Sequence, residues 1–129
     1  LIPDFINSAL ENSALVIPGD KNFSSSFCYV SDCLDACLKL MESEISQPVN
    51  IGSDVDANLT KICQIIIKFL DSKSDIKYAE RQLFVSELGL PDITKARENL
   101  GWMPIITLEN GFKKTIDDLR ASKGLKTMV

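Results

Sequence analysis

Short apolar runs that stop at proline, glycine or polar residues alternate along this chain with segments of helical periodicity. Strands are predicted where the runs are rich in β-forming residues, at 14–17, 26–30, 48–52 and 75–79. Helices are predicted where apolar residues recur at helical spacing, at 3–10, 32–41, 58–70, 91–100 and 107–122. The connections between these elements are short. The pattern therefore predicts an α/β fold in which short strands alternate with helices.

The predicted helix at 32–41 carries an apolar stripe. Ser31 or Asp32 is expected to cap its N-terminus, because a short oxygen-bearing side chain accepts a backbone N–H there. Four residues at helical spacing are expected to face the core, namely Leu34, Cys37, Leu38 and Met41.

The predicted helix at 91–100 has a signal at each end. Pro91 suits the first turn of a helix, and Gly101 is typical of the residue just past the last turn. Trp102 and Pro104 are expected to anchor the following loop against the core.

Length and charge exclude several classes of partner. The chain has 129 residues, of which 45% are hydrophobic and 25% charged, as in an ordinary globular domain. Its net charge of −4 disfavours nucleic acid, whose phosphates need a basic face. No apolar run approaches the roughly 20 residues of a membrane helix, and the N-terminus does not read as a signal peptide. We therefore expect a cytoplasmic protein, and the Leu at position 1 suggests that further sequence precedes it.

The chain contains four cysteines and no histidine. Cys33 and Cys37 are one helical turn apart, which could bring two thiolates together, but two soft ligands alone make a poor zinc site. Free, mostly buried thiols in a reducing cytoplasm are the favoured interpretation, and no metal is predicted. Without histidine, a Ser-His-Asp or Cys-His centre cannot be built from these residues, and general acid-base catalysis would fall on carboxylates, lysine or tyrosine. No catalytic residue is predicted in this chain.

Three stretches read as family motifs. Residues 26–32 read S-F-C-Y-V-S-D, residues 48–52 read P-V-N-I-G, and residues 91–104 read P-D-I-T-K-A-R-E-N-L-G-W-M-P. Together they resemble the C-terminal, substrate-binding part of NAD-dependent nucleotide-sugar epimerases, dehydratases and decarboxylases, the extended short-chain dehydrogenases. The nearest resemblance is to the UDP-glucuronate decarboxylases. It implies a substrate-binding domain at 1–122, a frayed tail at 123–129, and an NAD-binding Rossmann domain outside this chain.

The resemblance also implies a substrate site. The backbone of Ile17, Pro18 and Gly19 would contact the base of a nucleotide sugar, and Gly19 would let the backbone approach closely. In the relatives two arginines hold the diphosphate, and these positions are Ser25 and Gly89 here. A serine offers one neutral donor, and loss of a buried charged contact costs about 2–5 kcal/mol. Substrate binding is therefore expected to be weak or lost unless another cation compensates.

One cation could compensate for the lost arginines. Arg81 precedes the second arginine position by a few residues and could reach the diphosphate from a shifted loop. Lys21 and Lys77 are expected to be solvated surface charges.

The apparatus for redox chemistry is missing from these residues. No glycine-rich dinucleotide fingerprint occurs, and the tyrosines at 29 and 78 are followed four residues later by Cys33 and Gln82 rather than by lysine. The chain alone is therefore expected to bind no NAD and to have no activity. By resemblance, the parent enzyme would bind NAD in its N-terminal domain and could form a homodimer. The face that meets the missing domain should be unusually apolar.

A second hypothesis belongs to another class of function. Replacement of both arginines is also what a degenerate domain would show if it were retained for protein interaction or regulation after losing its substrate site.

Overall fold

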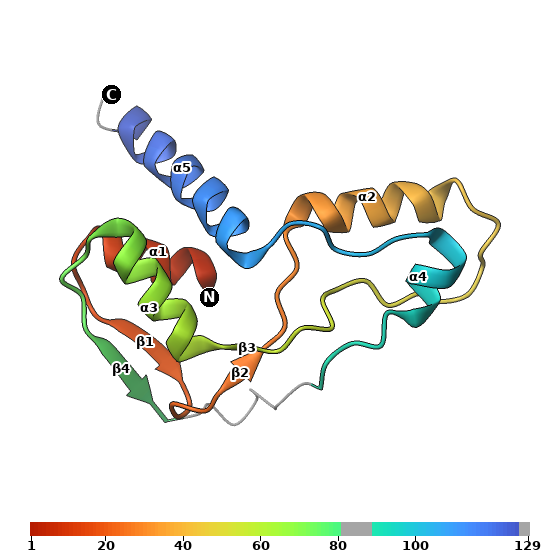
Figure 1. Ribbon diagram of the computed structural model, residues 1–129. Coiled ribbons are helices and arrows are strands. Elements are labelled where there is room, and N and C mark those ends of the chain that lie inside the picture. Colours follow the sequence, from red (N-terminus) through yellow and green to blue (C-terminus); the bar gives the residue numbers. More distant parts are fainter. Residues whose placement is uncertain (81–88, 127–129) are drawn as a thin grey trace. The chain divides into compact units, whose positions relative to one another are not determined.

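The computed structural model describes residues 1–80 and 89–126, with the backbone alone for 123–126. Within these residues the chain forms two compact units (Figure 1). Unit 1 comprises 1–24, 58–80 and 109–126, and unit 2 comprises 25–57 and 89–108. The last helix continues to Lys126, past the predicted boundary at 122. The assignment of 1–122 to one substrate-binding domain stays a prediction.

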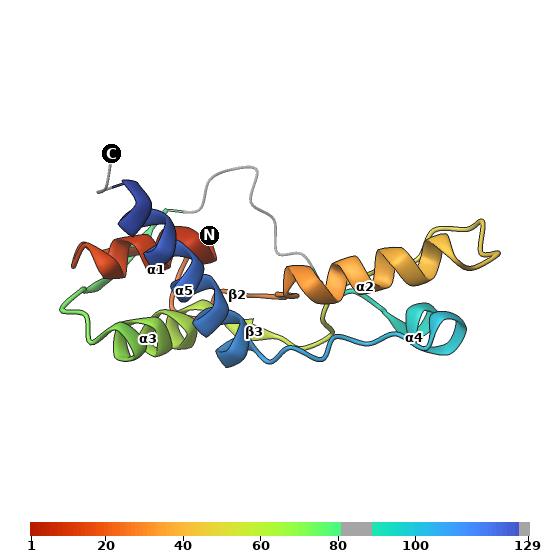
Figure 2. The ribbon, with the colours of Figure 1, turned by 90° about the horizontal axis from the view of Figure 1, so that it is seen from above.

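Unit 1 is built on two parallel strands. β1 (Leu15–Pro18) pairs with β4 (Ile76–Ala79), and Leu15 stands opposite Ile76. Helix α1 (Ile2–Leu10) and helix α3 (Leu59–Leu70) contact each other and both contact β1 (Figure 2). Parallel strands need a crossover connection, and α3 lies in the segment that joins β1 to β4. These elements confirm the strands predicted near 14–17 and 75–79.

The core of unit 1 comes from the apolar stripes of its helices and the inward residues of β1. Ile62, Cys63 and Ile66 of α3 are buried, as helical spacing predicts. The side chain of Asn58 accepts a hydrogen bond from the Lys61 N–H at 3.1 Å and so caps this helix. Phe69, near the end of the same helix, is 41% exposed, and the Lys113 ammonium of helix α5 (Leu108–Lys126) lies 5.5 Å from its ring centre.

Two of the predicted strands are wrong. The strands that form instead are β2 (Ser24–Ser25) and β3 (Ala57–Asn58), which pair with each other. Residues 26–29 are irregular, and Val30 already belongs to a helix. Residues 48–52 form no strand either, although Val49 and Ile51 pack against a buried cluster. In both stretches the β-forming side chains serve packing rather than a hydrogen-bonded ladder.

Unit 2 is organised around a buried carboxylate. Helix α2 (Val30–Met41) contacts helix α4 (Thr94–Leu100), and Asp32 of α2 is only 4% exposed. The Asp32 Oδ2 accepts hydrogen bonds from the N–H groups of Ile105, at 3.1 Å, and Ile106, at 2.9 Å. The indole Nε1 of Trp102 donates to the Asp32 carbonyl at 2.9 Å. Asp32 therefore fastens the loop after α4 to the start of α2, while Tyr29 is the N-cap.

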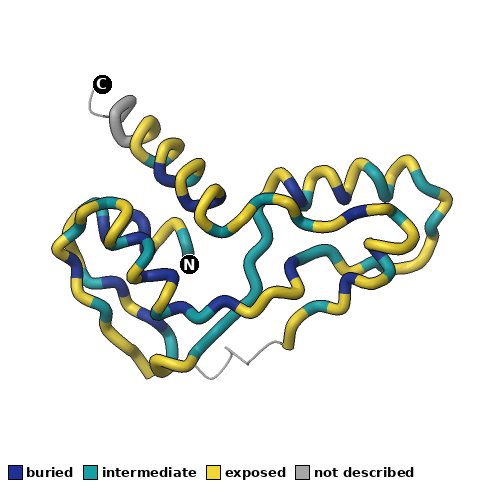
Figure 3. Tube along the Cα trace, viewed as in Figure 1, coloured by how far each residue is buried: buried dark blue, intermediate teal, exposed yellow. Residues whose placement is uncertain are grey.

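The predicted orientation of α2 is wrong. The residues of α2 that are buried are Asp32 and Ala36, and Ala36 packs with Ile93, Ala96 and Trp102. The stripe expected to face the core is largely exposed (Figure 3), with Leu34 and Leu38 at 59% and Met41 at 81%. The small side chain of Ala36 allows the Trp102 cluster to approach closely, and this contact sets the rotation of the helix.

Helix α4 begins later than predicted but ends where predicted. Its first residue is Thr94 rather than Pro91, and Asp92 Oδ1 accepts the Thr94 N–H at 2.9 Å. The hydrogen bonds from Thr94 lower the pKa of Asp92. Gly101 follows the helix at φ +58°, which confirms the predicted glycine stop. Trp102 is 2% exposed, which confirms its anchoring role.

We predict that Asp32→Ala destabilises the chain by about 2–4 kcal/mol, because it leaves two backbone N–H groups without their acceptor. Asp32→Asn keeps one acceptor oxygen and should cost less. The matched control is Asp35→Ala on the same helix, whose exposed pair with Lys39 at 3.7 Å should be worth less than about 1 kcal/mol. Urea unfolding followed by Trp102 fluorescence measures all three, and equal losses for Asp32→Ala and Asp35→Ala would contradict the assignment.

Candidate functional site

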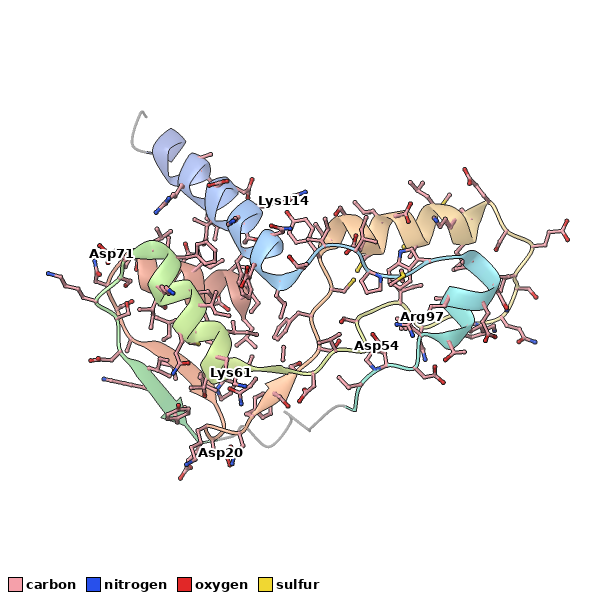
Figure 4. The ribbon with its side chains drawn as sticks, viewed as in Figure 1. Asp20, Asp54, Lys61, Asp71, Arg97 and Lys114 are labelled. Carbon is pink, nitrogen blue, oxygen red and sulfur yellow. The ribbon has the colours of Figure 1, made fainter. Side chains whose placement is uncertain are left out.

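A pocket lies at the carboxyl ends of the two parallel strands of unit 1. It has a volume of about 530 Å³ and is lined by Gly19, Asp20, Lys21, Tyr78, Ala79 and Glu80. Gly19 and Asp20 follow β1, while Tyr78 and Ala79 end β4. The carboxyl ends of parallel strands share one edge of a sheet, where ligands of open α/β sheets bind. Figure 4 shows Asp20 at this end of the ribbon.

The loop after β1 turns sharply at Gly19. Gly19 has φ +119°, a value that L-residues rarely adopt, and its N–H donates to the Ala79 carbonyl at 2.9 Å. The Asp20 carboxylate accepts the Asn22 N–H at 2.7 Å, and the Asp20 carbonyl accepts the Phe23 N–H at 3.1 Å. These bonds close a compact turn that presents Asp20 and Lys21 to the pocket.

The same loop is tied to helix α3 by side chains. The Lys21 carbonyl accepts hydrogen bonds from Asn58 Nδ2 at 3.0 Å and from Thr60 Oγ1 at 3.2 Å. Thr60 Oγ1 also lies 3.2 Å from the hydroxyl of Tyr78. These side chains of α3 therefore link the loop to β4 beside the pocket, whose lining residues Lys21 and Tyr78 they contact.

The charge of this pocket is unsuited to phosphate. Asp20 and Glu80 contribute two carboxylates against one ammonium from Lys21. Carboxylates accept hydrogen bonds and repel anions, so the wall suits hydroxyl or ring N–H donors. The Tyr78 side chain is 46% exposed and offers an aromatic surface beside these groups.

Unit 2 contains a second pocket of a different character. It has a volume of about 430 Å³, and its lining is mostly apolar, with Phe27, Val55 and Met103 among its residues. The polar side chains on it include Arg97 and Asp54, which form an ion pair at 2.7 Å (Figure 4). An anion would have to displace Asp54 from Arg97, so this pocket is a weaker candidate for a nucleotide.

The structure brings one of the predicted site residues to a pocket. Ile17 is fully buried inside β1, Pro18 ends that strand, and Gly19 lines the pocket of unit 1. Ser25 is half-buried in β2 and Gly89 is exposed, and neither lines the two pockets described here. Their roles stay predictions.

Other pocket residues were missed or cannot be placed. Arg81, suggested as a compensating cation, lies outside the described residues. Tyr78 and Glu80 were not predicted as site residues, although two parallel strands ending together would have pointed to them.

The thiols of half-buried Cys28 and buried Cys63 are poor nucleophiles and poor metal ligands. Burial raises the pKa of Cys63 to about 12, and burial together with the neighbouring Cys33 raises that of Cys28 to about 12. In the part of the chain that the structure describes, no three potential metal ligands come together. The helices within residues 1–80 and 89–126 include none with the length and hydrophobicity needed to cross a membrane.

The segment after β1 differs from the phosphate-binding segment of a dinucleotide site. A dinucleotide site places the pyrophosphate on the start of a helix that follows a parallel strand. Here β1 continues through the turn at Gly19 into the short strand β2, and the carboxylate of Asp20 occupies the position after the glycine.

Comparison with known proteins shows which proteins this chain is similar to. The NAD dependent epimerase/dehydratase family matches residues 1–52. UDP-glucuronic acid decarboxylase 1 of Danio rerio is 35% identical over 116 residues, which are 90% of this chain and 28% of that protein. UDP-glucuronic acid decarboxylase 5 of Arabidopsis thaliana is 32% identical over 125 residues, which are 97% of this chain and 37% of that protein.

Solved structures agree on the fold. UDP-glucose 4-epimerase of Thermotoga maritima, solved with UDP-glucose, superposes with a TM-score of 0.87 at 26% identity over 94% of this chain and 39% of the epimerase. An epimerase of Methanothermobacter thermautotrophicus gives a TM-score of 0.90 at 22% identity over 96% of this chain and 38% of its own.

This chain therefore has the α/β fold of the extended short-chain dehydrogenases, which confirms the predicted fold class. More narrowly, it is close to the UDP-glucuronic acid decarboxylases, which confirms the resemblance of its motifs. It spans 28% and 37% of the two decarboxylases compared.

The turn at Gly19 leads to a stability prediction with an internal control. A Cβ at Gly19 would lie 3.3 Å from the Phe23 Cγ, in a backbone conformation that disfavours side chains, whereas a Cβ at Gly101 would meet nothing within 4 Å. Gly19→Ala should therefore cost about 2–3 kcal/mol and Gly101→Ala about 1 kcal/mol. Urea unfolding of both variants tests this order, and a smaller loss for Gly19→Ala would refute the strained turn.

Proposed function

We propose that this chain is the nucleotide-sugar-binding part of an NAD-dependent enzyme that acts on UDP-sugars, most like a UDP-glucuronate decarboxylase. The observation that carries the proposal is the pocket around Gly19 at the carboxyl ends of β1 and β4. Gly19 is also one of the three residues, with Ile17 and Pro18, that the family resemblance assigns to the nucleotide base. The decarboxylases named above, and the epimerase solved with UDP-glucose, support the class of substrate.

In this proposal the pocket holds the base end of the nucleotide. Gly19 has no side chain, so the backbone of the turn can approach a flat ring closely. Tyr78, which is half-exposed, forms another part of the pocket lining. Ser25 and Gly89 supply no positive charge to the diphosphate, so we expect affinity in the micromolar range rather than tighter.

The chemistry of the reaction belongs to a dinucleotide-binding domain outside these residues. NAD, when bound there, would accept and return a hydride. The residues of this chain bind and orient the substrate, and neither Tyr29 nor Tyr78 has a lysine four residues later to support proton transfer. We therefore expect variants of this chain to change substrate binding, and expect the redox step to require the dinucleotide-binding domain.

We predict that the protein at its natural length binds UDP and UDP-glucuronic acid with micromolar Kd in isothermal titration calorimetry, and binds ADP at least tenfold more weakly. Gly19→Ala should weaken UDP binding at least tenfold while circular dichroism still reports a folded protein. The 129-residue chain alone, given NAD and UDP-glucuronic acid, should produce no NADH and release no carbon dioxide.

Two results would contradict this function. Turnover by the isolated chain would place the redox machinery within these residues. Failure of the natural-length protein to bind UDP or any UDP-sugar would favour the alternative, a degenerate domain retained for interaction or regulation.

We also infer that the dinucleotide-binding domain covers the exposed apolar face of α2. The face consists of residues at helical spacing with more than half of their surface exposed, namely Val30, Leu34, Leu38 and Met41. A monomer rarely leaves such a contiguous row in water. Most of the length of the two decarboxylases lies outside the part that this chain matches, which leaves room for a covering domain.

Replacing Leu34 and Leu38 by lysine in the natural-length protein should lower Tm by several degrees and weaken NAD retention, because two charges would be buried against the covering domain. Asp35→Lys, on an exposed position of the same helix, is the control and should change Tm by no more than a degree or two. An unchanged Tm in the double variant would mean that water, and not a domain, covers this face.

A further inference from the structure

The direction of the hydrogen bond between Thr60 and Tyr78, beside the unit 1 pocket, follows from which of their neighbours can donate. A threonine hydroxyl carries one hydrogen, and a backbone carbonyl can only accept. Thr60 Oγ1 lies 3.2 Å from the Lys21 carbonyl and must donate its hydrogen there. The contact of 3.2 Å between Thr60 Oγ1 and the Tyr78 hydroxyl must then be donated by Tyr78. The proton of Tyr78 is directed to Thr60 and the proton of Thr60 to Lys21.

These two hydrogen bonds determine whether the Tyr78 hydroxyl can donate to a ligand or only accept from it. Within residues 1–80 and 89–122, the Tyr78 hydroxyl bonds to Thr60, and that bond uses the hydroxyl hydrogen of Tyr78. The phenolic oxygen keeps its capacity to accept. Tyr78 is 46% exposed and lines the pocket, so the capacity to accept is what its hydroxyl can offer to a ligand there.

Some of the neighbouring groups of the pocket are also hydrogen-bond acceptors or have no free hydrogen to donate. Asp20 and Glu80 are acceptors, and the N–H of Gly19 is already given to the Ala79 carbonyl. Asn58 holds the Lys21 carbonyl independently of Thr60, at 3.0 Å. The loop therefore has a second attachment, and removal of the Thr60 hydroxyl frees the Tyr78 proton without releasing the loop.

We propose that Tyr78, oriented by Thr60, is a specificity-determining residue that selects a pyrimidine base with a ring N–H donor, as in uracil or thymine, over one with a ring nitrogen acceptor, as in cytosine. This inference rests on the proposed function, in which the base lies in this pocket. Uracil N3 carries a hydrogen that the phenolic oxygen can accept. Cytosine N3 carries a lone pair, so two acceptors would face each other without a hydrogen between them.

The test compares UDP with CDP, because the two nucleotides have the same sugar and diphosphate and differ only in the base. Calorimetry on the natural-length protein should give a Kd for UDP at least tenfold lower than for CDP. Thr60→Val keeps the shape of the side chain and frees the Tyr78 proton, which can then be donated to cytosine N3. The UDP preference should fall at least fivefold in Thr60→Val and also in Tyr78→Phe, which removes the hydroxyl.

A ratio of affinities separates this role from a merely structural one. If Thr60→Val only loosened the loop, both nucleotides would bind more weakly and their ratio would stay the same. Thr115→Val is the matched control, since the Thr115 hydroxyl donates to the Gly111 carbonyl at 2.8 Å within α5, and this variant should keep the wild-type ratio.

Each remaining outcome is decisive. UDP binding with a ratio that neither variant changes, or with no preference over CDP in the wild type, would overturn the inference and leave the proposed function standing. Absence of binding by either nucleotide to the wild-type protein would overturn both.

Discussion

The buried carboxylate of Asp32 is the interaction on which the architecture of unit 2 depends. An unpaired carboxylate at 4% exposure would be strongly unfavourable, and so would the unpaired N–H groups of Ile105 and Ile106. Each satisfies the other, with charge-assisted bonds at 3.1 and 2.9 Å. The Trp102 indole adds a bond to the carbonyl of the same residue. One aspartate thus fixes the irregular segment after α4 against the start of α2.

This constraint explains the unusual exposure of α2. Asp32 must face the loop, and Ala36, one turn later, then faces the Trp102 cluster. The larger apolar residues, such as Leu34 and Leu38, are left on another side of the helix. The helix therefore has two distinct faces, a narrow one satisfied within this chain and a wider apolar one. In the proposed function the wider face belongs to the dinucleotide-binding domain.

The sequence predicted the elements that depend on local signals. Gly101 ends its helix because a residue without a side chain enters φ +58° at low cost, and β1 and β4 follow from short apolar runs. The orientation of α2 was not predictable, because periodicity identifies an apolar face but not what covers it. Residues 26–30 have strand composition, yet Val30 begins a helix directly after Tyr29, whose backbone is still extended. Tyr78 joins the pocket only through the pairing of β4 with β1, which is a long-range contact.

The charges of the pocket bear on how a nucleotide would lie in the proposed site. A diphosphate beside Asp20 and Glu80 would be repelled, whereas a neutral base carrying an N–H donor would be held by the same acceptors. The pocket charge alone therefore favours the base near Gly19 and the phosphates away from it. By the family resemblance, Ser25 and Gly89 stand where guanidinium groups would hold the diphosphate, so these two positions do not oppose that preference. Recognition would then depend on the base more than on the diphosphate. Because Thr60 takes the Tyr78 hydrogen, Tyr78 would accept a hydrogen bond from the base, and this direction of the bond would determine which base is preferred.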